Sequence, residues 1–358
     1  SFKNNINILL YIFALRMLLL RFFSFTYGLL TEFKNILFNY NILKSKNFNK
    51  TLICVGNLST GGTGKTSFVD HLINMLSKDY KIGIISRGYK RKSKGFHFVD
   101  DIDTNKYGDE VCMLKSKYPF LIIAVDINRH RGINKLIDKN VELIIMDDGF
   151  QNRWVKADIQ FILTTFKNPF FNDYLLPFGR LREKKRNFKR SDYIIITKCD
   201  SSLDNKKKKY FSNHLCNKPT YFCQTKYLDL THIRTKKNFN ICSKTEILLV
   251  TAIADNSELF NDLAKISRKV HTYSKPDHYS FTKTDVDEII KTFNKIDTTD
   301  KIIVTTEKDR VKLMNFIRFI GKYPFYVQKI ALDFHENDNF EKNILEHVRE
   351  TSKNKELS

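Results

Sequence analysis

The chain has 358 residues and a net charge of +22, with 42 % hydrophobic and 28 % charged residues. This composition is typical of a folded globular protein with more than one core, and it excludes a disordered chain. The six cysteines form no CxxC pair and no Cys/His cluster with zinc spacing, which excludes a structural zinc site and favours a reducing compartment.

The N-terminal segment, residues 6–30, is apolar and long enough to span a bilayer, but Arg16 and Arg21 interrupt it. A charge inside a spanning helix costs at least ~2.5 kcal/mol. We therefore predict a membrane-associated helix that lies in the interface, with both arginines reaching the headgroups. A buried helix of the fold and a single membrane span remain alternatives.

After residue 50, short apolar runs alternate with helical patterns. This alternation favours a parallel sheet covered on both faces. We predict strands at Thr51–Val55, Lys81–Ile85, Leu121–Asp126, Glu142–Met146, Ile159–Leu163, Tyr193–Thr197, Ile247–Thr251, Val270–Tyr273, Ile302–Thr305 and Phe325–Ile330. Tyr221–Cys223 and Lys226–Asp229 are predicted as short linker strands.

The predicted fold class is α/β. A P-loop NTPase-like domain with a parallel sheet is expected to be followed by a second, smaller α/β domain and preceded by the membrane-associated helix. The expected boundaries are an N-terminal segment at 1–50, a P-loop domain at 51–215, linker strands at 216–240 and a second α/β domain at 241–358.

A glycine-rich loop follows the first predicted strand and opens a predicted helix. Its phosphate-binding residues are Ser59, Thr60, Gly61, Gly62, Thr63, Gly64, Lys65 and Thr66. Glycines let backbone N–H groups turn toward phosphate oxygens, and the helix N-terminus favours negative charge. Lys65 is expected to reach the β- and γ-phosphates, and the Thr66 hydroxyl to ligate Mg²⁺.

Two adjacent aspartates, Asp147 and Asp148, end another predicted strand and precede Gly149. A carboxylate at the carboxyl end of a strand beside a P-loop is in the right place to organise Mg²⁺. Adjacent residues of an extended chain project to opposite sides, so only one of the two needs to face the metal.

Each of the other short polar motifs is, taken alone, only weak evidence for a functional site. Ser86–Tyr89 follows the second strand, Gly108–Glu110 resembles a common helix start, and a lone histidine such as His278 is more often structural. Taken in order, however, these strings are specific. The chain resembles the tetraacyldisaccharide 4′-kinase family, also called lipid A 4′-kinases, from the apolar N-terminus to about residue 335. The resemblance rests on VGNLSTGGTGKT, SRGY, GDE, DDGFQ, LRE, PDHYSF and TEKD.

The resemblance implies ATP and Mg²⁺ as cofactors and transfer of the γ-phosphoryl group to the 4′-hydroxyl of a tetraacyl glucosamine disaccharide 1-phosphate. It also implies two α/β domains with the active site in a cleft, and attachment to the cytoplasmic face of the bacterial inner membrane. No nucleic acid is expected, because the aromatic residues lie within apolar runs rather than between basic residues. No obligate protein partner is inferred.

The resemblance also implies residue roles. Asp109 becomes the catalytic base and His278 the residue that orients or tunes it. Because they fall in different predicted domains, closure of the two domains is expected to bring them together. The implied metal ligands are Thr66, Glu110, Asp147 and Asp148. The residues implied near the substrate are Arg87, Tyr89, Gln151, Arg182 and Glu183.

The sequence departs from the family pattern in places. Asn152 stands where His usually follows DDGFQ, Ser67 replaces a proline after GKT, and Ser59 stands where the strict P-loop pattern has glycine. Two alternatives remain at this level. Thr197–Asp200 fits a guanine-reading pattern of GTPases, and a membrane-associated ATPase switch uses a similar glycine-rich loop.

Overall fold

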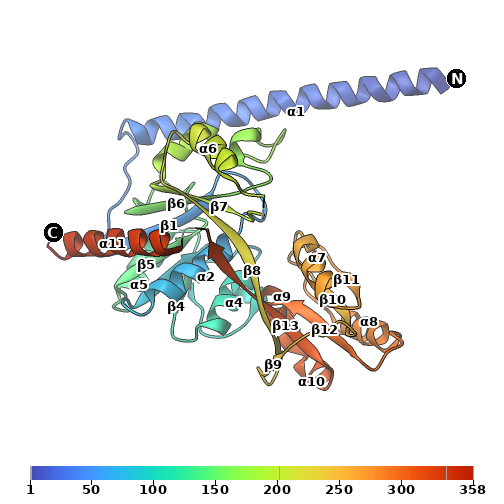
Figure 1. The fold of residues 1–358 in the computed structure, drawn as a ribbon. Helices are drawn as coiled ribbons and strands as arrows, with labels where there is room; N and C mark the ends of the chain where they lie inside the picture. Colours follow the sequence, from blue (N-terminus) through green and yellow to red (C-terminus); the bar gives the residue numbers. More distant parts are fainter. Residues whose placement is uncertain (1, 201, 336, 358) are drawn as a thin grey trace. The chain divides into compact units, whose positions relative to one another are not determined.

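The computed structural model describes residues 2–200, 202–335 and 337–357. Within it the chain forms two compact units. Unit 1 comprises Ser1–Lys65, Leu143–Gln224 and Phe334–Ser358, and unit 2 comprises Thr66–Glu142 and Thr225–Asp333. Figure 1 shows the elements of both units.

Unit 1 contains a parallel sheet in which β1, β5, β6 and β7 are almost completely buried. The central strand β1 pairs with β5 on one side and β6 on the other, and Val55 of β1 lies opposite Asp147 of β5. The strands, in spatial order, are β8 (Thr220–His232), β7 (Tyr193–Thr197), β6 (Ile159–Thr165), β1 (Thr51–Asn57) and β5 (Leu143–Asp147). Only the first part of β8, up to Gln224, belongs to unit 1. Burial on both faces explains the continuous runs of apolar residues in β1, β5 and β7.

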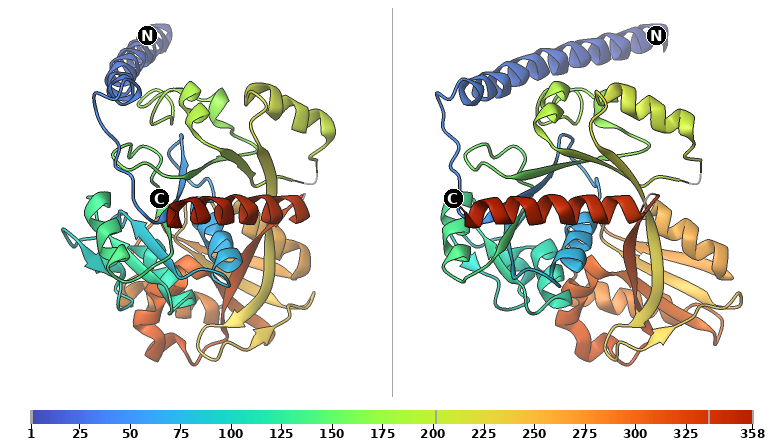
Figure 2. Two further views of the ribbon diagram at one scale, coloured as in Figure 1. Left: turned by 90° about the vertical axis from the view of Figure 1, so that its left-hand side faces the viewer. Right: turned by 60° about the vertical axis from the view of Figure 1, so that its left-hand side comes forward.

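Helix α11 (Asn337–Glu356) packs on the same unit although it ends the chain (Figure 2). His347 Nδ1 lies 2.9 Å from the Tyr193 hydroxyl, and the Asn343 amide donates to the Tyr221 hydroxyl at 2.8 Å. Thr51 and Ser352 share a hydrogen bond of 2.8 Å. The first core strand and the last helix are therefore neighbours.

The N-terminal helix α1 (Phe2–Asn39) has two faces. A stripe at helical spacing docks on unit 1: Ser24 donates to the Leu175 carbonyl at 2.9 Å, and Asn35 donates to Glu183 at 3.2 Å. Gly28 belongs to this stripe, because a Cβ there would lie 2.6 Å from Leu175 Cδ1.

The other face of α1 is apolar and exposed. It presents Ile12, Phe13, Leu15, Leu18, Leu19, Phe22, Phe23, Phe25, Leu29, Leu30, Phe33 and Ile36. Residues Ile12–Asn39 have the length and composition of a membrane-crossing helix. Only 11 % of the most apolar 18-residue stretch in this helix is buried against the rest of the protein. The alternative of a helix buried in the core is therefore wrong for this segment.

Unit 2 contains two groups of strands. In the first, β2 (Ile82–Ser86) and β4 (Ile122–Val125) are parallel, and the short β3 (His97–Phe98) joins β4 antiparallel. In the second, four parallel strands lie in the order β11 (Lys269–Ser274), β10 (Glu246–Thr251), β12 (Lys301–Thr306) and β13 (Phe325–Phe334).

Helices cover both groups of unit 2 strands and come together where α4 (Asp109–Lys117) meets α9 (Glu307–Leu313). Arg310 donates to the Ser116 hydroxyl at 2.9 Å, and Lys117 Nζ lies 3.5 Å from Glu307. The other long helices of this unit are α2 (Lys65–Leu76), α5 (Arg129–Ile137), α7 (Ser257–Ile266) and α8 (Lys283–Asn294), whereas α6 (Asn205–His214) belongs to unit 1. The α4–α9 contact brings residues near 110 and near 310 into one site.

The predicted fold class is confirmed: the chain is α/β with mostly parallel strands. The ten predicted core strands are present within a few residues at their ends. The short linker strands are wrong, because residues 220–232 form the single 13-residue strand β8. The compact units also divide the chain differently from the predicted domains, since α11 packs in unit 1 and residues 66–142 belong to unit 2. The domain boundaries themselves stay a prediction.

Candidate active site

The glycine loop between β1 and α2 has the backbone of a phosphate-binding loop. Gly61 has a φ of 111° and Gly64 a φ of 80°, values that favour glycine. A Cβ built at Gly61 or Gly62 would meet nothing within 4 Å. The loop therefore leaves open space next to its backbone, and α2 starts at Lys65 with its N-terminus at the loop.

Hydrogen bonds within unit 1 hold this loop in place. The Asn57 amide donates to the Thr63 hydroxyl at 2.9 Å, and the Thr197 hydroxyl donates to the Thr63 carbonyl at 3.0 Å. The Thr60 amide donates to the Arg180 carbonyl at 2.8 Å. Thr197 belongs to the segment that fits the guanine-reading pattern, and here its side chain supports the loop.

Asp148 is the carboxylate that the structure places beside the loop lysine. Its side chain lies 3.5 Å from Lys65 Nζ and accepts from Arg182 at 2.9 Å. Burial would raise the pKa of Asp148, but the charges of Lys65 and Arg182 outweigh it and lower the pKa. Asp148 has a φ of 49°, in the left-handed region that residues other than glycine rarely adopt.

Gln151 and Glu183 connect the loop to helix α1. The Gln151 amide donates to the Asn57 carbonyl at 2.8 Å and to Glu183 at 3.2 Å. Glu183 is 3 % exposed and also accepts from Asn35, Asn187 and Arg190. The structure thus shows Glu183 as a buried acceptor shared by several donors. Its predicted place near a substrate stays a prediction.

The predicted metal ligands include the hydroxyl and carboxylate oxygens that Mg²⁺ prefers. Asp147 ends β5 and is buried, whereas Thr66 and Glu110 are half-buried in the first turns of α2 and α4. Among the described residues, no group of three or more His, Cys, Asp or Glu side chains forms a ready-made metal site.

The second group of candidate residues lies in unit 2, around the first residue of α4. Asp109 Oδ2 lies 3.0 Å from His278 Nδ1 and 3.1 Å from Lys312 Nζ. Lys312 is 4 % exposed and also contacts Asp309 Oδ1 at 3.1 Å. We call Asp109, His278, Asp309 and Lys312 the Asp109 cluster.

The Asp109 cluster is a largely buried group of charged and polar side chains. Burial would raise the pKa of Asp109, but the His278 hydrogen bond and the charge and hydrogen bond of Lys312 lower it to about 2. Asp109 is therefore ionised at neutral pH and only accepts hydrogen bonds. Because the carboxylate only accepts, His278 Nδ1 is the donor in their contact.

Further residues surround the histidine. Lys308 Nζ lies 3.3 Å from His278 Nε2 and 2.9 Å from Asp277 Oδ1. The Tyr89 ring meets the imidazole edge to face, with centroids 4.9 Å apart, and is itself 61 % exposed. Arg87, the other predicted substrate residue of this loop, is exposed after β2.

The expectation about domain closure is wrong in one respect. Asp109 and His278 belong to the same compact unit, and their contact is already formed there. Sequence analysis also missed Lys312. The sequence contained a clue to this residue. Lys312 lies four residues after Lys308 and three after Asp309 of the TEKD string, so the three side chains project from the same side of a helix.

A parallel strand that runs into a glycine loop and a helix, with an aspartate beside the loop lysine, defines a P-loop nucleotide-binding protein of the α/β class. The model of the family "Tetraacyldisaccharide-1-P 4′-kinase" matches residues 16–349. The chain belongs to this family, and the sequence-based identification is confirmed. The match does not favour the GTPase or ATPase-switch alternatives.

Relatives support the same assignment. The chain is 37 % identical to a tetraacyldisaccharide 4′-kinase of Parabacteroides distasonis over 81 % of its length and 82 % of the relative. It is 34 % identical to that of Bacteroides thetaiotaomicron over 94 % of both chains. The crystal structure of LpxK from Aquifex aeolicus in complex with ATP matches with a TM-score of 0.71 and 27 % identity, covering 91 % of this chain and 97 % of the other.

Proposed function

We propose that this protein transfers the γ-phosphoryl group of ATP to the 4′-hydroxyl of a tetraacyl disaccharide 1-phosphate. The contact between Asp109 Oδ2 and His278 Nδ1, at 3.0 Å in a chain of this kinase family, is the observation that carries the proposal. The match to an ATP complex of LpxK supports ATP as the phosphoryl donor.

In the proposed reaction the glycine loop binds the phosphates of ATP. The open backbone at Gly61 and Gly62 leaves room for phosphate oxygens, and Lys65 neutralises charge on the transferred group. Asp148 and Arg182 hold Lys65 in position through the contacts described above. Thr66, Glu110, Asp147 and Asp148 are the residues proposed to hold Mg²⁺, which would supply further charge neutralisation when bound.

Asp109 receives the proton of the acceptor hydroxyl. Both cluster contacts fall on Oδ2, so Oδ1 is the oxygen proposed to face the acceptor. The acceptor oxygen bonds to phosphorus, the bond to ADP breaks, and the proton passes to Asp109. A carboxylate with a pKa of about 2 is a weak base, which suits a loose transition state in which the proton leaves late. His278 and Lys312 orient the carboxylate.

Helix α1 is proposed to lie on the cytoplasmic surface of the inner membrane. Its docked stripe faces unit 1 and its exposed apolar face is available to acyl chains. Arg16 and Arg21 are exposed on this helix and can reach headgroups. Replacement of Phe13, Phe22 and Phe25 by serine is expected to reduce sedimentation with anionic vesicles, and unchanged sedimentation would contradict this placement.

The kinase reaction is tested by transfer of labelled γ-phosphate from ATP to a tetraacyl disaccharide 1-phosphate in detergent micelles. Wild-type protein is expected to form product, and Asp109→Ala to lose ~10²-fold or more in rate. Asp138→Ala, an exposed aspartate at the end of α5, is the matched control and should retain activity.

ATP binding by each variant is measured beside the reaction, because Asp109 is proposed to act on the acceptor. If wild-type protein binds and hydrolyses ATP but never labels the lipid, the kinase proposal fails and a nucleotide-dependent switch takes its place. If Asp109→Ala transfers phosphate at the wild-type rate, the function stands and the base assignment is wrong.

A further inference from the structure

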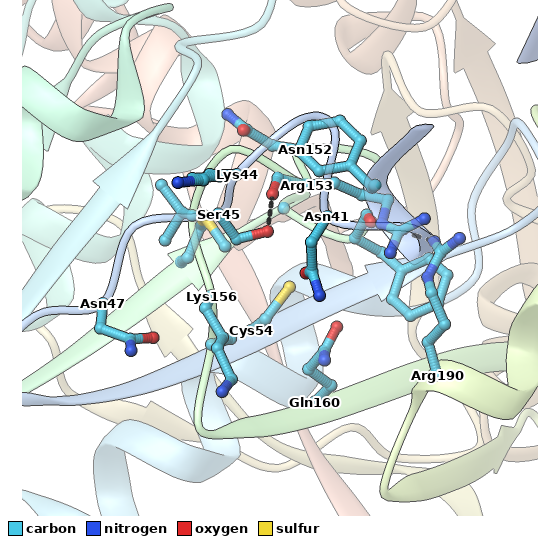
Figure 3. A pocket seen from close by; sticks show the side chains of 16 residues that line it. Asn41, Lys44, Ser45, Asn47, Cys54, Asn152, Arg153, Lys156, Gln160 and Arg190 are labelled. Atoms are coloured by element: carbon cyan, nitrogen blue, oxygen red, sulfur yellow. Dashed lines mark hydrogen bonds between the residues drawn. The ribbon is translucent and has the colours of Figure 1, made fainter. Parts of the chain in front are cut away.

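Unit 1 contains a cavity of about 550 Å³ that none of the roles above uses (Figure 3). It begins at Phe38 in the last turn of α1, follows the segment after that helix, and reaches the first residues of β6. Its size falls in the range of pockets that hold small ligands. Gly149 and Phe150, directly after Asp148, also line it.

The charge of this cavity is one-sided. Four cations line it, namely Lys44, Arg153, Lys156 and Arg190, and no aspartate or glutamate is among the described lining residues. Glu183 neutralises Arg190 at 2.9 Å. The other three cations form no ion pair within the described part of the chain. The cavity therefore carries a net positive charge that an anion would balance.

Two of these cations converge. The guanidinium groups of Arg153 and Arg190 each donate to the Asn35 amide oxygen at 3.2 Å. Burial and the charge of Arg190 lower the pKa of Arg153, so the two groups repel each other. Aromatic faces hold both in place, with Arg153 5.0 Å from the Phe38 ring and Arg190 4.3 Å from the Phe150 ring.

The placement of the cavity restricts its ligand. One wall is the end of the apolar helix α1, and another is the loop that also carries Asp148 beside Lys65. Guanidinium and ammonium groups are the usual partners of phosphate. A ligand with acyl chains and a phosphate matches this combination, and the proposed acceptor carries both.

We propose that this cavity binds the phosphate of a lipid headgroup, with the phosphate already present on the acceptor as the expected source. The inference rests on the proposed function for the identity of that acceptor. Phosphate bound here would hold one end of the acceptor, while the hydroxyl to be phosphorylated is at the other end of the disaccharide. Lys44 and Lys156 are exposed and would close over the phosphate.

The test compares two double variants with the same change in charge. Lys44→Glu with Lys156→Glu alters the cavity, and Lys46→Glu with Lys189→Glu alters exposed lysines that do not line it. All four side chains are exposed, so both variants are expected to fold. Each is assayed with the acceptor 1-phosphate and with the same acceptor lacking that phosphate, in non-ionic micelles and in vesicles containing phosphatidylglycerol.

Binding is measured without ATP, so that it does not depend on transfer. Trp154 is the only tryptophan and its ring lies 5.1 Å from that of Phe38, which lines the cavity. Its fluorescence is therefore suited to report titration with either acceptor. A failure of the kinase proposal would appear as binding without transfer, and would leave the test of the cavity intact.

The cavity variant is expected to bind the acceptor 1-phosphate about ten-fold more weakly than wild type, with a matching rise in KM. Its binding of the acceptor lacking phosphate, and all binding by the control variant, should stay unchanged. A loss seen with both acceptors, but only in phosphatidylglycerol vesicles, would assign the cavity to a bilayer phospholipid. Equal behaviour of the two double variants under all conditions would overturn the proposal.

Discussion

The phosphate loop of unit 1 and the Asp109 cluster of unit 2 present their chemistry in different ways. The loop relies on backbone conformation, with φ values of 111° and 80° at Gly61 and Gly64 and open space beside the chain. The cluster relies on side chains that are 169 and 203 residues apart in the chain, as Asp109 meets His278 and Lys312. One site is local and open, and the other is long-range and buried.

This difference has a consequence for mutation. A change in the loop acts through phosphate binding or through the local fit of backbone atoms, because its groups are close in sequence. A change in the cluster acts through the electrostatics of a buried carboxylate. The free energy of a buried charge depends strongly on the opposite charges and hydrogen-bond donors beside it. Mutations in the loop should therefore alter phosphate binding or local packing, whereas mutations in the cluster should alter properties that depend on pH.

The largest expected effect is in the loop. Lys65→Met removes the only side chain proposed to neutralise the transferred phosphate, and kcat/KM for ATP should fall about 10²–10³-fold. The radioactive transfer assay measures this, with Lys78→Met, an exposed lysine after α2, as the control. A fall of less than about ten-fold would mean that the backbone amides act nearly alone.

The next expected effect concerns packing in strand β1, which leads into the loop. A Cβ at Gly56 would lie 2.5 Å from Phe150 Cβ and 3.0 Å from its backbone nitrogen. Gly56→Ala should therefore lower the free energy of unfolding by about 1–3 kcal/mol. Urea unfolding measures the loss. Gly62→Ala is the control, because a Cβ there meets nothing within 4 Å, and equal stabilities of the two variants would contradict the close fit.

The Asp109 cluster should make the free energy of unfolding depend on pH in the acidic range. The folded pKa of Asp109 is about 2, below its ordinary value of 3.8. Its ionised form therefore stabilises the fold above about pH 4 by about 2 kcal/mol, and this contribution disappears as the pH falls toward 2. The difference in free energy of unfolding between wild type and Asp109→Asn should shrink over this range. A constant difference would show that Asp109 is not held by its cationic partners.

The smallest expected effect concerns Lys312. Lys312→Gln keeps hydrogen-bonding atoms beside Asp109 and Asp309 but removes the positive charge. The pKa of Asp109 should then rise, so the acid limb of kcat/KM should move to higher pH by about one unit. Lys312→Arg should leave the limb in place. If both variants shift it equally, Lys312 acts through packing and not through charge.

Local features of this site were predictable from sequence. The glycine loop was identified because strand, glycines, lysine and helix follow one another over about a dozen residues, and β1 and α2 flank the loop as expected. Asp148 was identified because it follows a buried strand. The hydrogen bonds of Glu183 could not be predicted in this way. Its four partners come from separate segments, namely α1, the turn after β5 and a 3-10 helix.

The sequence by itself determined the α/β class, the phosphate loop and the family, because these depend on periodicity and on residues near one another in the chain. Only the tertiary structure decided that Asp109 and His278 share one compact unit, that Lys312 joins them, and that the final helix packs beside the first core strand. The reason is physical. Contacts across hundreds of residues follow from how helices and strands pack, and no local pattern records which buried charges will meet.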